Sequence, residues 1–374
     1  MRIAILTLPL YTNYGGILQC YALQTVLQRM GHDVKVLTKP RYGFKYYLIY
    51  PFAVLKRMFR RILFNENIGI LKAPHEIIRR DIDKFIYARI NFYSSKNWKL
   101  SVPLKFDAVI VGSDQVWRPS YCLDIETMFL SFLGNSRVKR IAYAASFGRD
   151  DCLEFSKSQL ENCKELLQSF NGVSVREKSG VDICKNIFKV DAVQLLDPTL
   201  LLNSNDYSDL IQKVEDPFSD RTMFVYILDY SEEKRKLVDQ IAREKCLKVY
   251  WINEEILNSD VSWRKRVKKS IEQWLYCFNN ATFILTDSFH GCVFSIIFKK
   301  QFIAIANEER GVNRFNSLFK SLFIDDRLIF SVADYEMKKV QLSKDIDYDK
   351  VSKVLECERE RSCSFIMSLL NKIS

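Results

Sequence analysis

The sequence lacks several patterns that would place a protein in a simple class. It has three histidines, and its ten cysteines include no CxxC pair, so no zinc-binding spacing is present. It has no run of 18 uncharged apolar residues, no low-complexity block and no internal repeat. Residues 1–6 run directly into a strand-like segment and do not have the pattern of a signal peptide. These absences favour a cytoplasmic globular protein with reduced thiols and no metal.

The length and charge give the first positive indications. A chain of 374 residues is too long for one ordinary core, which predicts two domains. The formal net charge of +11 suits an anionic partner, which can be a nucleic acid, an acidic membrane surface, or a phosphorylated or carboxylated ligand.

Two series of alternating strands and helices follow one another along the chain. Strands are expected at 2–7, 33–37, 108–112, 140–144, 172–176 and 192–196, and then at 223–228, 247–251, 282–286 and 302–305. Helices are expected between them, at 17–30, 154–168, 231–244 and 262–278, with an amphipathic helix at 349–373. This alternation predicts an α/β protein of GT-B-like architecture, in which two Rossmann-like domains enclose a ligand cleft. We expect the domains at 1–200 and 201–345, followed by a C-terminal helix at 346–374.

A basic, aromatic segment at 39–65 interrupts the first series. It contains seven Lys or Arg residues, no acidic residue and eight aromatic residues. Drawn as a helix from Phe52, it places its basic residues on one face and its apolar residues on the other. Such a helix suits an anionic membrane interface, or else it covers the sheet with its apolar face. No nucleic-acid-binding motif accompanies the charge, so we expect no nucleic-acid partner.

One histidine follows an apolar strand directly. His290 lies in the segment Thr-Asp-Ser-Phe-His-Gly at 286–291, between the expected strand 282–286 and a long apolar run. Ligands of open α/β sheets bind at the carboxyl ends of strands, so His290, Ser288 and Gly291 are candidate site residues. A histidine without other support would more often be a bystander.

Two further strand ends carry small and polar residues. The first strand leads through Asn13, Gly15 and Gly16 into a helix, whose free N–H groups suit an anion, although a plain tight turn is the commoner meaning of such a pattern. The pattern is neither GxGxxG nor a P-loop, so it does not imply a nucleotide. After the strand at 108–112 come Ser113, a candidate base Asp114, and Trp117, which either stacks on a sugar or packs in the core.

Arginines follow two other strands. Arg176 ends the strand at 172–176, where it can grip a phosphate or carboxylate, or pair with Glu177. Arg310 and Arg314 follow the strand at 302–305 and either face a ligand or face water. Together with His290 and Asp114, these residues predict a site for a small, multiply charged anion.

With these segments in place, the chain resembles the polysaccharide pyruvyltransferase family over about residues 2–330. The resemblance rests on the order and spacing of the segments 13–19, 111–117, 143–148, 174–179, 196–200, 286–291 and 313–314. It implies a GT-B-like fold and transfer of pyruvate from phosphoenolpyruvate to a sugar of a polysaccharide or its lipid-linked precursor, as in capsule or exopolysaccharide synthesis. The first domain would be the acceptor side and the second the donor side. No further cofactor and no metal is implied.

The resemblance also assigns roles, with one departure. His290 matches the family's histidine, whereas Ser288 stands where the family places a donor-binding arginine. Arg176, Arg310 or Arg314 would then bind more of the phosphate. We expect His290 to act as acid or phosphate ligand and Asp114 as base. A peripheral position at the inner face of the membrane follows if 39–65 binds lipid. The alternatives are a sugar-nucleotide glycosyltransferase of the same fold, or a non-catalytic saccharide-binding or membrane-surface protein.

Overall fold

The structure is a computed structural model. It describes residues 1–37, 55, 58–59, 75–95, 97–211, 214, 216–218, 221–252, 265–306 and 311–371. Apart from three residues, the basic aromatic segment 39–65 lies outside the described residues, and so does Arg310. The predictions made for both therefore stay predictions.

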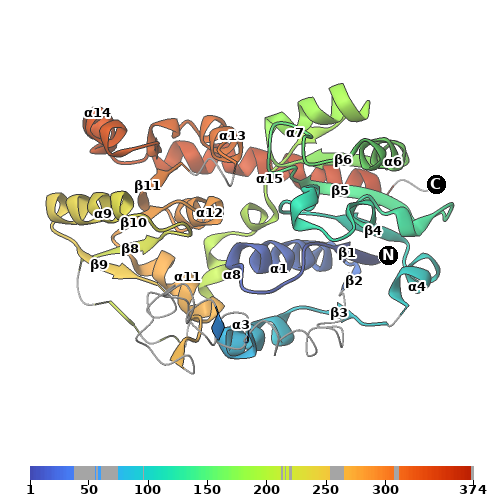
Figure 1. Ribbon diagram of the computed structural model, residues 1–374, viewed down its shortest axis with the longest axis horizontal. Coiled ribbons are helices and arrows are strands. Elements are labelled where there is room, and N and C mark those ends of the chain that lie inside the picture. The colour runs from blue at the N-terminus through green and yellow to red at the C-terminus, as the bar shows by residue number, and fades with distance from the viewer. Residues whose placement is uncertain are drawn as a thin grey trace.

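The first half of the chain forms a seven-stranded parallel sheet in the order β3-β2-β1-β4-β5-β6-β7 (Figure 1). Its strands are β1 Arg2–Leu6, β2 Asp33–Leu37, β3 Phe92–Tyr93, β4 Ala108–Val111, β5 Lys139–Ala145, β6 Gly172–Val175 and β7 Val193–Gln194. The central strand β4, Ala-Val-Ile-Val, is wholly buried, as expected of a parallel strand covered on both faces. The order reverses between β1 and β4, where adjacent connections leave in opposite directions.

The second half forms a five-stranded parallel sheet in the order β12-β11-β10-β8-β9. Its strands are β8 Thr222–Tyr226, β9 Lys248–Trp251, β10 Phe283–Thr286, β11 Gln301–Ile305 and β12 Leu328–Ile329. Here the order reverses between β8 and β10. Each sheet therefore has one switch point at its carboxyl edge, the place where α/β proteins bind ligands.

Helices cover the faces of both sheets. They are α1 Tyr14–Arg29, α3 His75–Arg89, α4 Trp98–Lys105, α5 Ile125–Met128, α6 Lys157–Gln168, α7 Lys178–Ile183, α8 Ser204–Ser208, α9 Glu232–Lys245, α11 Ile271–Asn280, α12 Phe289–Ile297, α13 Asn313–Leu322, α14 Val332–Leu342 and α15 Tyr348–Asn371. The helix expected from residue 262 begins instead at Ile271, because Ser270 caps it and forms a capping box with Gln273.

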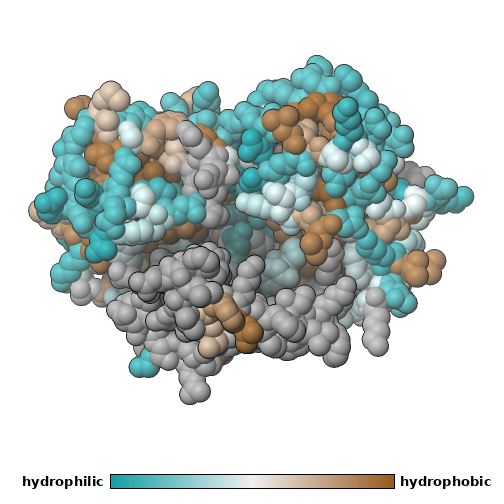
Figure 2. Space-filling model, viewed as in Figure 1, coloured by the Kyte–Doolittle hydropathy of each residue, from teal (hydrophilic) through white to brown (hydrophobic). Residues whose placement is uncertain are grey.

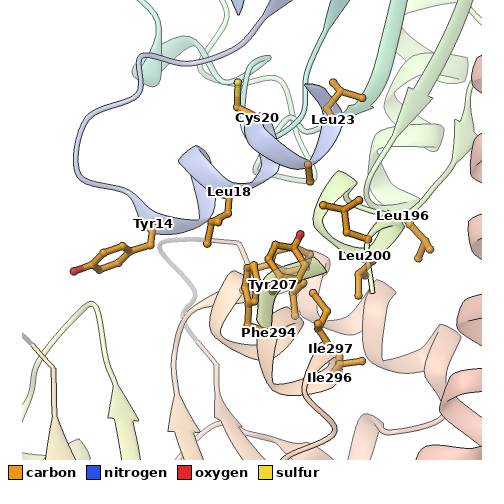
Figure 3. Close-up of a cluster of buried hydrophobic side chains, with 14 of the residues drawn as sticks. Tyr14, Leu18, Cys20, Leu23, Leu196, Leu200, Tyr207, Phe294, Ile296 and Ile297 are labelled. Carbon is orange, nitrogen blue, oxygen red and sulfur yellow. The ribbon is translucent and has the colours of Figure 1, made fainter. Parts of the chain in front are cut away.

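The two halves share one hydrophobic core. Side chains of α1 pack on residues of the second half: Tyr14 stacks on Trp274, and Figure 3 shows Leu18 pointing from α1 toward Tyr207 and Phe294. The last helix, α15, runs from the second half back along the first (Figure 1). Its residue Arg359 donates to the Leu200 carbonyl at 2.6 Å, and Lys139 of β5 donates to the Leu369 carbonyl at 2.9 Å. Packing and α15 together fix the carboxyl edges of the two sheets beside each other.

The surface of the described residues is largely hydrophilic, and the view in Figure 2 shows a hollow between the two halves. None of the helices in the described part of the chain is both long and apolar enough to cross a membrane.

Candidate functional site

The β1 and β4 ends are joined by one glutamine. Gln19 of α1 donates through Nε2 to Thr7 Oγ1 at 2.9 Å, and its Oε1 accepts the Ser113 N–H at 2.9 Å. All three residues are buried. The start of α1 is therefore fixed against the loop that follows β4. This positions Ser113 and Asp114 at the switch point of the first sheet.

Arg176, at the end of β6, lies between two aspartates. Its Nη1 is 2.7 Å from Asp197 Oδ2, and its Nη2 is 3.4 Å from Asp114 Oδ1. Asp197 also accepts hydrogen bonds from the Thr199 N–H and hydroxyl and from the Ser113 hydroxyl. Burial alone would raise the pKa of Asp197, but its interactions with His290, Arg176 and Thr199 hold that pKa well below its ordinary value. Asp197 is thus an anchored carboxylate.

His290 reaches this carboxylate from the other half. It lies in the first turn of α12, and its Nε2 is 3.6 Å from Asp197 Oδ2. The imidazole packs directly on Gly15 in the first turn of α1, where a Cβ would come closer than 3.0 Å to the ring. The N-terminal turns of α1 and α12 therefore converge on one histidine. The first turn of α1 has no acidic residue, and the Asn13 side chain makes no capping hydrogen bond there, which leaves a helix end suited to an anion.

Phe289, the neighbour of His290, contacts two guanidinium groups. The Arg176 Cζ is 4.5 Å from its ring centroid, and the Arg314 Cζ is 5.4 Å from it. Burial, and then repulsion from Arg176, lower the pKa of Arg314 to about 10. The group therefore keeps its charge at neutral pH. Arg314 brings α13 of the second half to the same site.

Glu177 is a further buried carboxyl beside these arginines. Its Oε1 accepts the Phe147 N–H at 3.0 Å. Burial raises the pKa of Glu177, although the charges of Arg176 and Arg314 oppose that shift. A carboxyl that holds its proton more readily than usual can donate as well as accept in such a site.

The described site is more balanced in charge than the sequence predicts. The sequence indicated an excess of cations, but Arg176 and Arg314 lie with three carboxyl groups, those of Asp114, Asp197 and Glu177. Arg176 is bound by two of them and is therefore not an open phosphate ligand. The sequence did not predict this balance because the ion pairs of Arg176 join strand ends that are far apart in the sequence. No local sequence pattern indicates such pairs.

Several predicted site residues have other positions. Trp117 is fully buried, stacks on Phe129 at 5.0 Å and donates to the Met128 carbonyl, so the prediction that it stacks on a sugar is wrong for this structure. The Ser288 hydroxyl caps α12 by accepting the Gly291 N–H at 3.3 Å.

The three remaining small or polar residues have different surroundings. Gly291 packs on Thr286 of β10, where a Cβ would not fit. Gly16 lies beside Asp114, and a Cβ there would be 3.4 Å from Asp114 Oδ2. Asn13 is exposed just ahead of α1. The structure therefore brings together Gly15, Gly16, Ser113, Asp114, Arg176, His290 and Arg314.

Asp197 and Glu177 are the residues that the sequence did not single out for a role. Asp197 comes three residues after β7 and just before Pro198, so it has the same strand-end position as the other candidates. This strand-end position is the sequence feature by which Asp197 could have been identified as a site residue. Glu177 was considered only as a partner of Arg176.

The described residues offer no group of three or more His, Cys, Asp or Glu side chains that could hold a metal ion. The described site holds one imidazole, two guanidinium groups, three carboxyl groups and the N-termini of α1 and α12.

The fold has counterparts among known structures. A putative UDP-N-acetylglucosamine 2-epimerase from Listeria monocytogenes matches with 9% identity and a TM-score of 0.55, over 100% of this chain and 97% of its own. The UDP-GlcNAc 2-epimerase of Methanocaldococcus jannaschii matches with 14% identity and a TM-score of 0.46, over 99% of each chain. MurG of Acinetobacter baumannii matches with 12% identity and a TM-score of 0.43, over 100% and 99%. The protein has a GT-B-like fold of two Rossmann-like halves, as predicted.

The family model for polysaccharide pyruvyl transferases matches residues 13–309. The chain belongs to this family, which confirms the resemblance seen in the sequence. No curated protein matches the chain. Membership supports a transferase with a donor substrate and a saccharide acceptor.

Proposed function

We propose that the protein transfers pyruvate from phosphoenolpyruvate to a saccharide and forms a cyclic ketal. The observation that carries this proposal is the position of His290, held by Gly15 of α1 at the N-terminus of α12 and 3.6 Å from the Asp197 carboxylate. The two helix ends and Arg314 suit the phosphate and carboxylate of such a donor.

The residues suggest a division of tasks. His290 would deliver a proton to the methylene carbon of the donor, while Asp197 stabilises the charged imidazole. The adjacent carbon then accepts a sugar hydroxyl oxygen, whose proton passes to Asp114. The bond between this carbon and the phosphate oxygen then breaks, and the oxygen of a second sugar hydroxyl bonds to the same carbon. The proton of that hydroxyl passes to the departing phosphate, and proton exchange with solvent restores His290 and Asp114. Arg176 holds Asp114 and Asp197 in place for these steps.

Because Ser288 caps a helix, we propose that Arg314 takes the phosphate-binding task of the arginine that the family has at this position. Arg314 is buried and lies against Phe289, one residue from His290. We further propose that the enzyme works in the cytoplasm on a precursor at the inner face of the membrane, with 39–65 as the membrane contact.

The test is phosphate release from phosphoenolpyruvate by purified protein with a panel of free and lipid-linked saccharides. We expect release with at least one acceptor, and a loss of about 10²- to 10⁴-fold in His290→Gln. Glutamine keeps a polar side chain but cannot act as an acid. His32→Gln is the matched control and should keep full activity, because His32 is half-exposed and directly precedes β2, at the amino edge of the sheet.

Binding by calorimetry separates the rival functions. Binding of UDP-GlcNAc with turnover, and none of phosphoenolpyruvate, would identify a sugar-nucleotide glycosyltransferase instead. Saccharide or liposome binding without any turnover would identify a non-catalytic protein. Full activity of His290→Gln would remove only the role given to that residue.

A further inference from the structure

Two segments of the first half carry exposed apolar side chains. The loop that follows β4 exposes Tyr121 and Leu123, and a second segment exposes Leu153. Glu154 ties the two segments together, because its Oε2 accepts the Ser120 N–H at 3.1 Å. Of the three exposed side chains, Tyr121 has a ring that can pack on an apolar surface and a hydroxyl that can hydrogen-bond beside it.

The Tyr121 ring is held in place by an arginine. The Arg118 Cζ lies 4.7 Å from the ring centroid, and its Nη1 donates to the Tyr121 hydroxyl at 3.3 Å. Arg118 is itself fixed, since its Nε donates to Glu154 Oε1 at 3.0 Å. Arg118 lies over one face of the ring and Tyr121 is 45% exposed, so its exposed surface lies away from the arginine. A ring that is already fixed loses little conformational entropy when it binds a ligand.

Arg118 also connects this ring to the candidate site. Its Nη1 donates to Gln115 Oε1 at 3.3 Å, and Gln115 directly follows Asp114. Gly148 packs on both side chains, since a Cβ there would lie 2.6 Å from Gln115 Oε1 and 3.1 Å from the Arg118 Cδ. The segment from Asp114 to Tyr121 is therefore one packed unit, which begins at the candidate base and ends at the exposed ring.

The second half approaches the same unit. Gly311 packs on the Gly148 carbonyl so closely that a Cβ would not fit, and that Cβ position is 3.7 Å from Arg314 Nε. The Tyr121 phenol is near enough to Arg314 to act electrostatically on its guanidinium. Arg314 in turn lies against Phe289. Tyr121 thus lies at the edge of the described site, on the side of the first half.

We propose that Tyr121 binds the acceptor sugar, with the apolar C–H face of a pyranose packed on its ring. This inference rests on the proposed function, because it assigns the acceptor to the first half and the donor to His290 and Arg314. Tyr121 takes the stacking role that the sequence suggested for Trp117, which is buried in the core. The acceptor class is thereby narrowed to pyranosides with a continuous C–H face, whose two reacting hydroxyls lie away from the ring.

The probes are the methyl β-glycosides of galactose, glucose, N-acetylglucosamine and N-acetylmannosamine, each added to the full chain. Saturation-transfer NMR reports which glycosides bind and which of their protons contact the protein. We expect at least one of them to bind, with the strongest transfer to the C–H protons of one pyranose face. Binding of none of the four would overturn the proposal.

Substitutions at Tyr121 assign that binding to the ring. Tyr121→Ala should weaken it about tenfold, because the aromatic contact is lost, while Tyr121→Phe and Tyr121→Trp should keep it within about threefold. Phe323→Ala is the matched control. Phe323 is 62% exposed and has Lys350 at 4.2 Å from its ring centroid, but it lies at the opposite end of α13 from Arg314. Equal binding by the wild type and Tyr121→Ala would contradict the proposal, and so would an equal loss in Phe323→Ala or in Tyr121→Phe.

Binding and turnover give separable outcomes. In an active protein, Tyr121→Ala should raise the KM for the acceptor about tenfold and leave the KM for phosphoenolpyruvate within about twofold. Phosphate release with an unchanged acceptor KM in Tyr121→Ala would reject this inference alone. Glycoside binding that depends on Tyr121, in a protein that releases no phosphate from phosphoenolpyruvate, would uphold the sugar site and reject the proposed reaction.

Discussion

Each half of the molecule buries one aspartate completely at the carboxyl edge of its sheet, and the two differ in their partners. Asp287 follows β10 directly and accepts the Leu228 and Asp229 N–H groups at 2.6 and 3.1 Å. It also pairs with Lys234 at 2.7 Å. All of these partners belong to its own half, in the stretch from the end of β8 to the first turn of α9.

Asp197 has partners in both halves. Arg176, Ser113 and Thr199 come from the first half or the connection after it, whereas His290 comes from the second. The Nε2 of His290 lies beyond hydrogen-bond distance of Asp197 and has no other hydrogen-bond partner among the described residues. Asp287 therefore closes a loop, while Asp197 supports a histidine that can still bind a ligand. Asp197 and Asp287 are both buried carboxyl groups, so only their partners differ. These partners indicate a structural role for Asp287 and a functional role for Asp197.

The strongest test of this comparison is Asp197→Asn. Loss of one member of a buried ion pair should cost about 3 kcal/mol in the free energy of unfolding. Activity per folded molecule should also fall by about 100-fold or more, since the imidazolium loses its stabilising charge. Urea unfolding and phosphate release, measured on the same preparation, give the two values.

Asp287→Asn is the matched control for that variant. It should lose a similar free energy of unfolding, about 3 kcal/mol, but keep its activity per folded molecule within about threefold. If both variants lose activity equally, the distinction between the two aspartates is wrong.

The stability difference at Asp197 should depend on pH. The pKa of Asp197 is held well below its ordinary value, so the folded state favours the carboxylate. Its contribution is then complete above the unfolded-state pKa of about 4 and is lost as the pH falls toward the folded-state pKa. Unfolding free energies of the wild type and Asp197→Asn should therefore differ most near pH 7 and converge below about pH 4. A constant difference from pH 7 to pH 3 would contradict the ion-pair account.

Substitutions at Gly15 and Gly16 test the packing of α1 on the His290 ring with a smaller change in the chain. An alanine Cβ at Gly15 would collide with the His290 ring, whereas at Gly16 it would meet Asn13 and Asp114 at 3.2 to 3.4 Å. Displacing a catalytic group by about 1 Å can cost about 100-fold in rate, so Gly15→Ala should lose about that factor.

Gly16→Ala should stay within about fivefold of the wild type, because its neighbours need to move only slightly. Both variants gain helix propensity, but the collision at Gly15 should also lower the thermal stability of Gly15→Ala, so the rates are compared per folded molecule. Equal rates of phosphate release in the two variants would show that the packing of Gly15 on His290 has no role in activity.

The sequence alone predicted the alternating strands and helices and the polar residues that follow the strands. The predicted strand 108–112 and helix 349–373 agree with β4 and α15 to within two residues, since apolar periodicity determines both. Asp114 and Arg176 converge because the parallel strands of one sheet end at one edge, and His290 joins them from the carboxyl edge of the second sheet. Asp197 could not be assigned as their partner, because its contacts join residues 84 positions apart, as with Ser113, or across the two sheets. Trp117 followed a strand end as well, yet core packing determined its place.

Ser288 extends the comparison to a residue beside His290 and gives the smallest expected effect. Its hydroxyl caps α12, as the Ser331 hydroxyl caps α14 by accepting the Asp334 N–H at 3.1 Å far from the site. Ser288→Ala and Ser331→Ala should each lose about 1 kcal/mol in the free energy of unfolding, and Ser288→Thr should restore most of it. If Ser288 only caps the helix, Ser288→Ala keeps the wild-type affinity for phosphoenolpyruvate. A fall in that affinity that Ser331→Ala does not share would mean that the hydroxyl leaves its cap to bind the donor, and the second half would then contribute more than His290 and Arg314 to the site.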